Sequence, residues 1–180
     1  MKALIPLADG VEEMEAVIMA DVLRRAGWEV TLAGLKPGAV TASRGVRLLP
    51  DTEWKDVRPG DFDALLLPGG SVGARHLAEH EGVQAAIRAF DAPGRLLGAI
   101  CAAPLALQAA GVLRGRRATC HPAVRGQLTQ AETVEARVVE AGTIITAAGP
   151  GVAFEFALAL VARVNGRARA EALAAEMLVR

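Results

Sequence analysis

Residues 2–33, KALIPLADGVEEMEAVIMADVLRRAGWEVTLA, contain two short apolar runs separated by a segment with helical periodicity. Residues 2–8 form a short apolar run, which predicts a strand buried on both faces. Residues 12–26 place apolar side chains at helical spacing and are followed by Gly27, a residue typical of helix ends. Residues 28–33 predict a second strand. A strand, a helix and a strand in this order favour an α/β fold.

The alternation of strand and helix continues to the end of the chain. The predicted segments are strands at 63–67, 95–100, 117–120 and 143–147, an added strand at 134–140, helices at 72–80, 83–90, 102–110, 152–164 and 169–178, and a hairpin or similar excursion at 37–50. Apolar strands that alternate with helices indicate a mainly parallel sheet covered on both faces. Because no linker, repeat or low-complexity tract interrupts the 180 residues, we expect one domain spanning residues 1–180.

The charge balance and the low aromatic content of the chain argue against some classes of binding partner. The 20 basic and 20 acidic residues cancel, and only 3% of residues are aromatic, so we expect no binding of nucleic acid or of acidic membranes. The basic run at 114–117 is interpreted as a solvated turn. Apolar runs are too short for a signal peptide or a membrane span, which favours a soluble, cytoplasmic protein. Two cysteines, Cys101 and Cys120, do not make a disulfide scaffold.

Segments rich in glycine or polar residues follow four of the predicted strands. These segments are 8–10, 68–70, Cys101 and 120–121. In sheets of this class, ligands bind beyond the carboxyl ends of the strands. We therefore expect the four segments to converge on one edge of the sheet.

Glu15 lies on the apolar face of the first predicted helix, at about 100° per residue. A buried, unpaired carboxylate costs several kcal/mol, so we expect Glu15 to have a raised pKa and to hold a proton. The alternative is a carboxylate in the first helical turns that reaches water, which is the interpretation given to Glu12 and Glu13.

Cys101 lies where a predicted strand passes directly into a predicted helix. Small residues surround it (Gly98, Ala99, Ala102 and Ala103), as a sharp nucleophile turn requires. The helix start is expected to lower the pKa of the thiol, and the thiolate is the reactive form. Backbone N–H groups of Gly70, in the Pro68-Gly69-Gly70 segment, and of Ala102 are candidates to face an oxyanion. The alternative is a small buried cysteine without chemistry.

The histidines give weaker signals. His121 follows a predicted strand and is a candidate for proton transfer, although it equally fits a loop-fixing role. Cys120 is expected to be buried. His76 and His80 have no third ligand at useful spacing, so we expect neither a metal site nor a cofactor. Ala102, rather than a histidine, follows Cys101, which weakens the case for triad peptidase chemistry.

Several short motifs occur in order along nearly the whole chain. They are residues 12–15 (EEME), 24–27 (RRAG), 67–70 (LPGG), 99–102 (AICA), 121–122 (HP), 149–151 (GPG) and 154–157 (FEFA). As a set they resemble the ThiJ/PfpI superfamily, and within it the branch of the Parkinson disease-associated protein deglycase and its bacterial relatives. The resemblance implies a flavodoxin-like, class I glutamine amidotransferase-like three-layer sandwich, and a homodimer that uses the first helix.

The resemblance also implies a site. Cys101 would be the nucleophile, hydrogen-bonded to protonated Glu15, with an oxyanion pocket from the N–H groups at Gly69, Gly70 and Ala102 and with His121 nearby. The branch is associated with conversion of methylglyoxal to lactate without a cofactor and with removal of early methylglyoxal adducts. The peptidase branch carries a histidine directly after the cysteine, which places this chain outside it.

Three functions are consistent with these residues. We expect a cofactor-independent glyoxalase or deglycase that acts on a small dicarbonyl or glycated substrate and protects against oxidative and carbonyl stress. The alternatives are a redox-sensing or chaperone-like stress protein whose cysteine is oxidised to sulfinate, and a weak cysteine hydrolase or peptidase. Two positions depart from the family: Cys120 has no family role, and Ala148 stands where the human-like member has an arginine.

Overall fold

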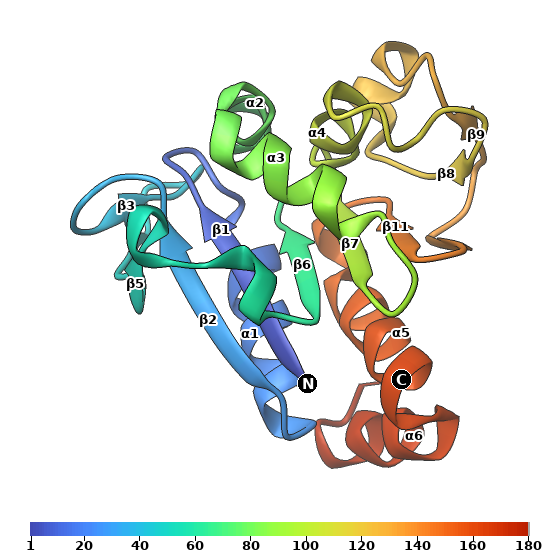
Figure 1. Cartoon of the computed structure of the whole chain (residues 1–180). Helices are drawn as coiled ribbons and strands as arrows, with labels where there is room; N and C mark the ends of the chain where they lie inside the picture. The colour runs from blue at the N-terminus through green and yellow to red at the C-terminus, as the bar shows by residue number, and fades with distance from the viewer. Residues whose placement is uncertain (180) are drawn as a thin grey trace.

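The computed structural model describes residues 1–179 and contains a central sheet of seven strands (Figure 1). Across the sheet the strands follow the order β10 (Val138–Ala141), β11 (Ile144–Ala147), β7 (Leu96–Ile100), β6 (Ala64–Leu67), β1 (Lys2–Leu7), β2 (Glu29–Gly34) and β5 (Thr52–Glu53). Every neighbouring pair is parallel except β10 and β11. This confirms the mainly parallel sheet predicted from the sequence.

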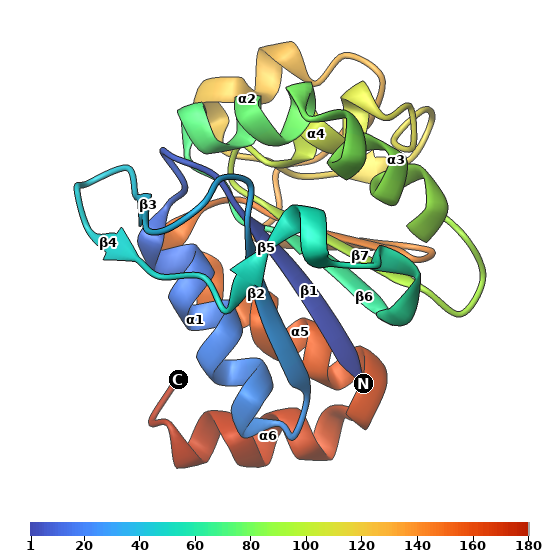
Figure 2. The ribbon, with the colours of Figure 1, turned by 60° about the vertical axis from the view of Figure 1, so that its left-hand side comes forward.

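Helices cover both faces of the sheet and complete a three-layer α/β sandwich. Figure 2 shows α2 (Ser71–Glu79), α3 (Glu81–Phe90) and α4 (Pro104–Ala109) on one side, and α1 (Glu13–Arg25), α5 (Ala153–Asn165) and α6 (Arg167–Glu176) on the other. No helix within residues 1–179 combines the length and the apolar character needed to cross a membrane.

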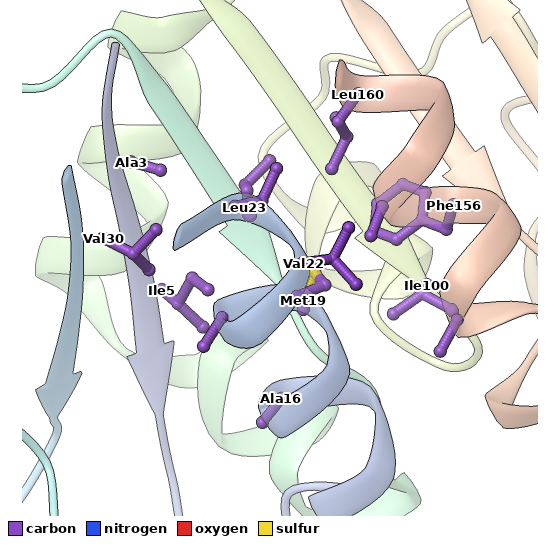
Figure 3. Close-up of a cluster of buried hydrophobic side chains, with 14 of the residues drawn as sticks. Ala3, Ile5, Ala16, Met19, Val22, Leu23, Val30, Ile100, Phe156 and Leu160 are labelled. Atoms are coloured by element: carbon purple, nitrogen blue, oxygen red, sulfur yellow. The ribbon is translucent and has the colours of Figure 1, made fainter. Parts of the chain in front are cut away.

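The sheet separates two apolar clusters. One lies between the sheet and α1 and α5, where Met19 and Leu23 pack with Ile5 and Phe156 (Figure 3). The other lies beneath α3 and α4. Strands β1, β6, β7 and β11 are buried almost throughout because both of their faces contact helices. This packing holds the carboxyl ends of the central strands in fixed positions.

Two predicted segments differ from the structure. The strand predicted at 117–120 is only β8 (Arg117–Ala118), and it pairs with β9 (Glu132–Thr133) outside the main sheet. The added strand spans 138–141 rather than 134–140, because its ladder is limited to the four residues opposite β11. The excursion at 37–50 is confirmed as an antiparallel hairpin of β3 (Val40–Thr41) and β4 (Arg47–Leu48).

Short 3₁₀ turns link several of these elements. They are η1 (Trp54–Asp56), η2 (Pro59–Asp61), η3 (Pro122–Gln127) and η4 (Pro150–Val152). Turns η3 and η4 both lie beside the carboxyl ends of the strands, since residues from each line the cavity described next.

Candidate functional site

A cavity of about 670 Å³ opens at the carboxyl ends of the central strands. Its walls include Gly10 from the loop after β1, Gly70 from the loop after β6, Cys101 from the end of β7, and His121. The predicted convergence on one edge is therefore confirmed for these segments. Cys120 is not part of the wall: it is buried among apolar side chains of the cluster beneath α3 and α4, as expected.

A second hollow of similar volume, about 660 Å³, lies at the amino ends of β7 and β11. It is lined by Asp91, Arg116 and Arg163 among others, and it contains no cysteine or histidine. Arg116 is already paired with Asp91 at 2.6 Å. We therefore take the cavity at the carboxyl ends as the candidate site.

Cys101 occupies a strained turn between β7 and α4. Its φ angle of 63° lies in the left-handed region, where a residue other than glycine is uncommon. The turn is held by two backbone hydrogen bonds: the Cys101 N–H donates to the Ala147 carbonyl at 2.9 Å, and the Cys101 carbonyl accepts from the His121 N–H at 2.9 Å. These bonds project the side chain into the cavity wall, as the small neighbours of Cys101 predicted.

Glu15 lies on α1 with its side chain fully buried, as its place on the apolar face predicted. Its Oε2 accepts a hydrogen bond from the Gly69 N–H at 2.7 Å. Its Oε1 is buried and has no hydrogen-bond partner of ordinary geometry within residues 1–179. The Cys101 side chain lies close enough to the carboxyl group to influence its pKa.

Glycine is required where these groups meet. A Cβ at Gly69 would lie 2.7 Å from the Cys101 Cβ and 2.8 Å from Glu15 Oε2. Gly70 has a φ of +85°, and a Cβ there would lie 2.2 Å from the Gly10 carbonyl oxygen. The Pro68-Gly69-Gly70 segment thus lets three loops approach closely.

The ionisation of the two groups is coupled. Burial raises the pKa of the Glu15 carboxyl to about 7, and hydrogen bonds from Gly69 and Cys101 oppose this only in part. Burial, together with the charge of an ionised Glu15, raises the pKa of the Cys101 thiol to about 12. Hydrogen bonds from the Gly70 and Ala102 N–H groups act in the opposite direction and lower the pKa of the thiol.

This differs from the lowered thiol pKa expected from the sequence. Helix α4 begins at Pro104, three residues after Cys101, and its six residues give only a short macrodipole. Burial beside a carboxylate is the stronger effect. When Glu15 keeps its proton, the repulsion disappears, and the N–H groups of Gly70 and Ala102, which lower the pKa of the thiol, are then opposed mainly by burial. The first proton lost near pH 7 therefore belongs to the pair and not to one residue.

His121 lines the same cavity, and its ring is anchored locally. Its Nδ1 accepts a hydrogen bond from the Ala123 N–H at 3.2 Å, which leaves the proton of the neutral ring on Nε2. The His121 ring lies beside Gly149, where a Cβ would lie 3.1 Å from it. The structure thus brings His121 to the site and also gives it the loop-fixing contact considered as the alternative.

Sequence reasoning missed the contribution of the β3–β4 hairpin. Ser43 and Arg44 from its tip line the cavity. The hairpin is tied to the start of α1, since the Ser43 hydroxyl donates to Glu12 Oε2 at 2.7 Å and to Glu13 Oε2 at 2.9 Å. Glu13, expected to reach water, is therefore buried. Helical periodicity could not reveal this contact, because a loop 30 residues away along the chain provides it.

His76 and His80 have structural partners. The His76 Nδ1 lies 3.0 Å from the Asp9 carbonyl oxygen, and the His80 Nδ1 accepts from the Val83 N–H at 3.2 Å at the start of α3. Within residues 1–179, no group of three or more His, Cys, Asp or Glu side chains is arranged to hold a metal ion.

Comparison with known proteins shows which family the chain belongs to. The chain matches the DJ-1/PfpI family over residues 1–163. It is 43% identical to protein dj-1beta of Drosophila melanogaster over 180 residues, which cover 98% of this chain and 96% of that protein. It is 37% identical to the glutathione-independent glyoxalase DJR-1.2 of Caenorhabditis elegans over 172 residues, which cover 94% of this chain and 91% of that protein.

The fold of this chain is also similar to those of solved structures. The crystal structure of Drosophila melanogaster DJ-1beta has a TM-score of 0.95 and covers 99% of this chain and 98% of its own, at 43% identity. The structure of oxidized Toxoplasma gondii DJ-1 has a TM-score of 0.93 and covers 98% and 97%, at 36% identity. A family match over most of the chain and relatives of this identity lead to one conclusion: the chain belongs to the DJ-1/PfpI family.

Proposed function

We propose that this protein is a cofactor-independent glyoxalase that converts methylglyoxal to lactate through the Cys101 thiolate and that also acts on early methylglyoxal adducts in carbonyl stress. One observation carries the proposal: Cys101 lines the cavity together with Gly70 and Ala102, whose N–H groups act on its sulfur, and a buried, proton-holding Glu15 lies beside it. The relative DJR-1.2, named as a glutathione-independent glyoxalase, supports the same activity class.

The chemistry begins with the pair carrying one negative charge. The Cys101 sulfur bonds to the aldehyde carbon, and the N–H groups of Gly70 and Ala102 stabilise the oxygen that becomes negative. The Glu15 proton neutralises that oxygen, which gives a hemithioacetal and leaves Glu15 as a carboxylate. A residue with a pKa near 7 can both give and take protons at neutral pH.

The second half of the reaction moves a proton between neighbouring carbons. The Glu15 carboxylate removes the proton from the former aldehyde carbon and returns it to the adjacent carbon through an enediol, which leaves a thioester on Cys101. Water then breaks the carbon–sulfur bond, releasing lactate and the thiolate. The aldehyde carbon is oxidised and the ketone carbon is reduced, so no external oxidant or reductant is needed.

The direct test is lactate formation from methylglyoxal by purified protein without glutathione. Cys101→Ala should reduce the rate to the uncatalysed background, and Glu15→Gln should reduce it strongly while leaving the fold intact. Because free methylglyoxal modifies amines spontaneously, deglycation is tested separately on a purified adduct after free aldehyde has been removed. Lactate production by Cys101→Ala equal to that of the wild type would refute the proposal.

A second candidate function is a redox sensor. The N–H groups of Gly70 and Ala102 that face the sulfur would equally stabilise a sulfinate, and one similar solved structure is described as oxidized Toxoplasma gondii DJ-1. Two equivalents of peroxide oxidise the thiolate to sulfinate and are reduced to water. A stable two-oxygen mass increase at Cys101, together with negligible methylglyoxal turnover, would favour the sensor over the enzyme.

We also propose that the protein forms a homodimer through α1. Met14 and Val17 on this helix are 52% and 50% exposed, although they lie among helix residues that pack on the core. Burying two large apolar side chains per subunit favours association. Light scattering should give twice the chain mass, and Met14→Glu combined with Val17→Glu should give the single-chain mass. A single-chain mass for the wild type would refute the dimer.

A further inference from the structure

We infer that Arg44 gives the cavity a preference for substrates with an anionic tail, and that 2-oxoaldehydes carrying a carboxylate are the favoured class. The inference rests on the proposed glyoxalase function and adds the substrate class to it. It begins from a residue that lines the cavity with Cys101 but has no part in the chemistry described above.

The position of Arg44 is fixed by the hairpin tip. Its backbone N–H donates to Glu13 Oε1 at 3.0 Å, and the neighbouring Ser43 N–H donates to the Val11 carbonyl at 2.7 Å. The Ser43 hydroxyl adds the two bonds to Glu12 and Glu13 already described. These contacts hold the backbone of Arg44 against the start of α1, beside the cavity that this residue lines.

The charges around the cavity leave the Arg44 guanidinium available. Within residues 1–179 it forms no ion pair, whereas the Asp9 carboxylate in the same wall is paired with Lys36 at 2.6 Å. Glu12 also lines the cavity, and one of its oxygens already accepts the Ser43 hydroxyl. Among the described residues of the wall, Arg44 is the one permanent cation.

A guanidinium in this position selects by charge and shape. It can donate two parallel hydrogen bonds to a carboxylate. Methylglyoxal is neutral and has no carboxylate to accept them. With the aldehyde at Cys101 and the tail at Arg44, 4,5-dioxopentanoate would give 2-hydroxyglutarate. The sulfur bonds to the aldehyde carbon, Glu15 moves the proton to the neighbouring carbon, and water breaks the carbon–sulfur bond, so the balance is that of methylglyoxal conversion.

The first test does not depend on turnover. Iodoacetate and iodoacetamide alkylate Cys101 by the same displacement of iodide and differ in one negative charge. The measured quantity is the ratio of their rates at Cys101. Arg44→Gln should lower the ratio of iodoacetate to iodoacetamide about three- to tenfold, and added salt should shrink this difference because the side chain is solvent-exposed.

Two variants serve as controls. Arg47→Gln removes another exposed arginine, from β4, that does not line the cavity, and it should leave the ratio unchanged. Arg44→Lys retains the charge and should keep most of the preference. An equal ratio in the wild type and Arg44→Gln would overturn the inference even if methylglyoxal is turned over.

The second test compares kcat/KM for 4,5-dioxopentanoate and for methylglyoxal. Arg44→Gln should lower the first about tenfold more than the second, mainly through KM. An equal loss for both substrates would overturn the inference. If the wild type converts neither substrate, the glyoxalase proposal fails, and the alkylation ratio still decides whether Arg44 recruits anions to Cys101.

Discussion

The two cysteines of this protein are close in space but differ in nearly every physical property. The His121 N–H, directly after Cys120, donates to the Cys101 carbonyl. Cys101 is half-buried in a left-handed turn, with two N–H groups at its sulfur and a carboxyl group beside it. Cys120 is 1% exposed among apolar side chains, and burial raises the pKa of its thiol. Reactivity therefore depends on what surrounds the sulfur and not on the residue type.

Removing the Cys101 sulfur should abolish most of the activity, whereas removing the Cys120 sulfur should not. Cys101→Ala should lower methylglyoxal turnover by about 10³-fold or more, because no other nucleophile lines the cavity wall at that point. Cys120→Ala should leave turnover within about twofold and cost about 1–2 kcal/mol of unfolding free energy through lost packing. Lactate assays measure the turnover, and urea denaturation measures the unfolding free energy. Equal losses of turnover in the two variants would show that the cysteines do not differ in function.

Alanine substitutions at two glycines, one near each cysteine, should also differ strongly in their effect on the unfolding free energy. Gly70→Ala forces a Cβ to 2.2 Å from the Gly10 oxygen at a φ of +85°, and should cost about 3 kcal/mol or more together with most of the activity. Gly126, in the turn after Cys120, has no atom within 4 Å of an added Cβ and no positive φ. Gly126→Ala should change the unfolding free energy by less than about 1 kcal/mol. Thermal unfolding measures the stability of both variants. Equal losses of stability in Gly70→Ala and Gly126→Ala would contradict this prediction.

The stability of the protein should depend on pH through Glu15, the carboxyl group beside Cys101. The pKa of Glu15 is 4.5 without the fold and about 7 within it, so the folded state binds this proton more tightly. Its contribution to the unfolding free energy is full below pH 4.5 and falls by about 3 kcal/mol as pH rises to about 7. Glu15→Gln should remove this fall in denaturant titrations at several pH values.

The pH dependence of alkylation should report the ionisation of the Cys101 thiol but not that of the buried Cys120 thiol. Alkylation of Cys101 by iodoacetamide should rise toward high pH, because burial and the charge of ionised Glu15 raise the pKa of the thiol to about 12, and Glu15→Gln should move this rise to lower pH by removing that charge. Cys120 should stay unmodified in the folded protein throughout. Mass spectrometry of alkylated peptides separates the two sites, and a profile unaffected by Glu15→Gln would show that the carboxyl group does not control the thiolate.

The smallest effect is expected at the histidine between the two regions. His121→Ala removes the acceptor for the Ala123 N–H and should cost about 1 kcal/mol of unfolding free energy. His121→Asn provides a side-chain oxygen at the same helix-start position and should recover most of that loss. If His121→Asn recovers stability but not turnover, the ring also takes part in the chemistry; recovery of both would limit His121 to anchoring the loop.

Local patterns predicted the elements well where burial is decided within one segment. The apolar run of β1 and the amphipathic spacing of α1 were enough to place both, and the position of Glu15 on the apolar arc predicted its burial. Small residues around Cys101 predicted the sharp turn, which the φ of 63° confirms. These features depend on neighbours along the chain.

Features that depend on distant segments were not predictable in the same way. The burial of Glu13 and the place of Arg44 follow from a hairpin that folds back on α1. The raised pKa of Cys101 reflects the carboxyl group of another helix and the depth of the turn, which helix position alone does not reveal. Likewise β8 could be recognised as extended but not assigned to a separate small sheet.

The place of β7 in the strand order has a consequence for how the protein loses function. β7 has two strands on one side and four on the other, so neither edge of the sheet includes it. Fraying that begins at β5 or at β10 can proceed without releasing the strand that ends at Cys101. Amide hydrogens of β7 should therefore exchange with solvent only through global opening, and chemical competence should persist until the whole molecule unfolds.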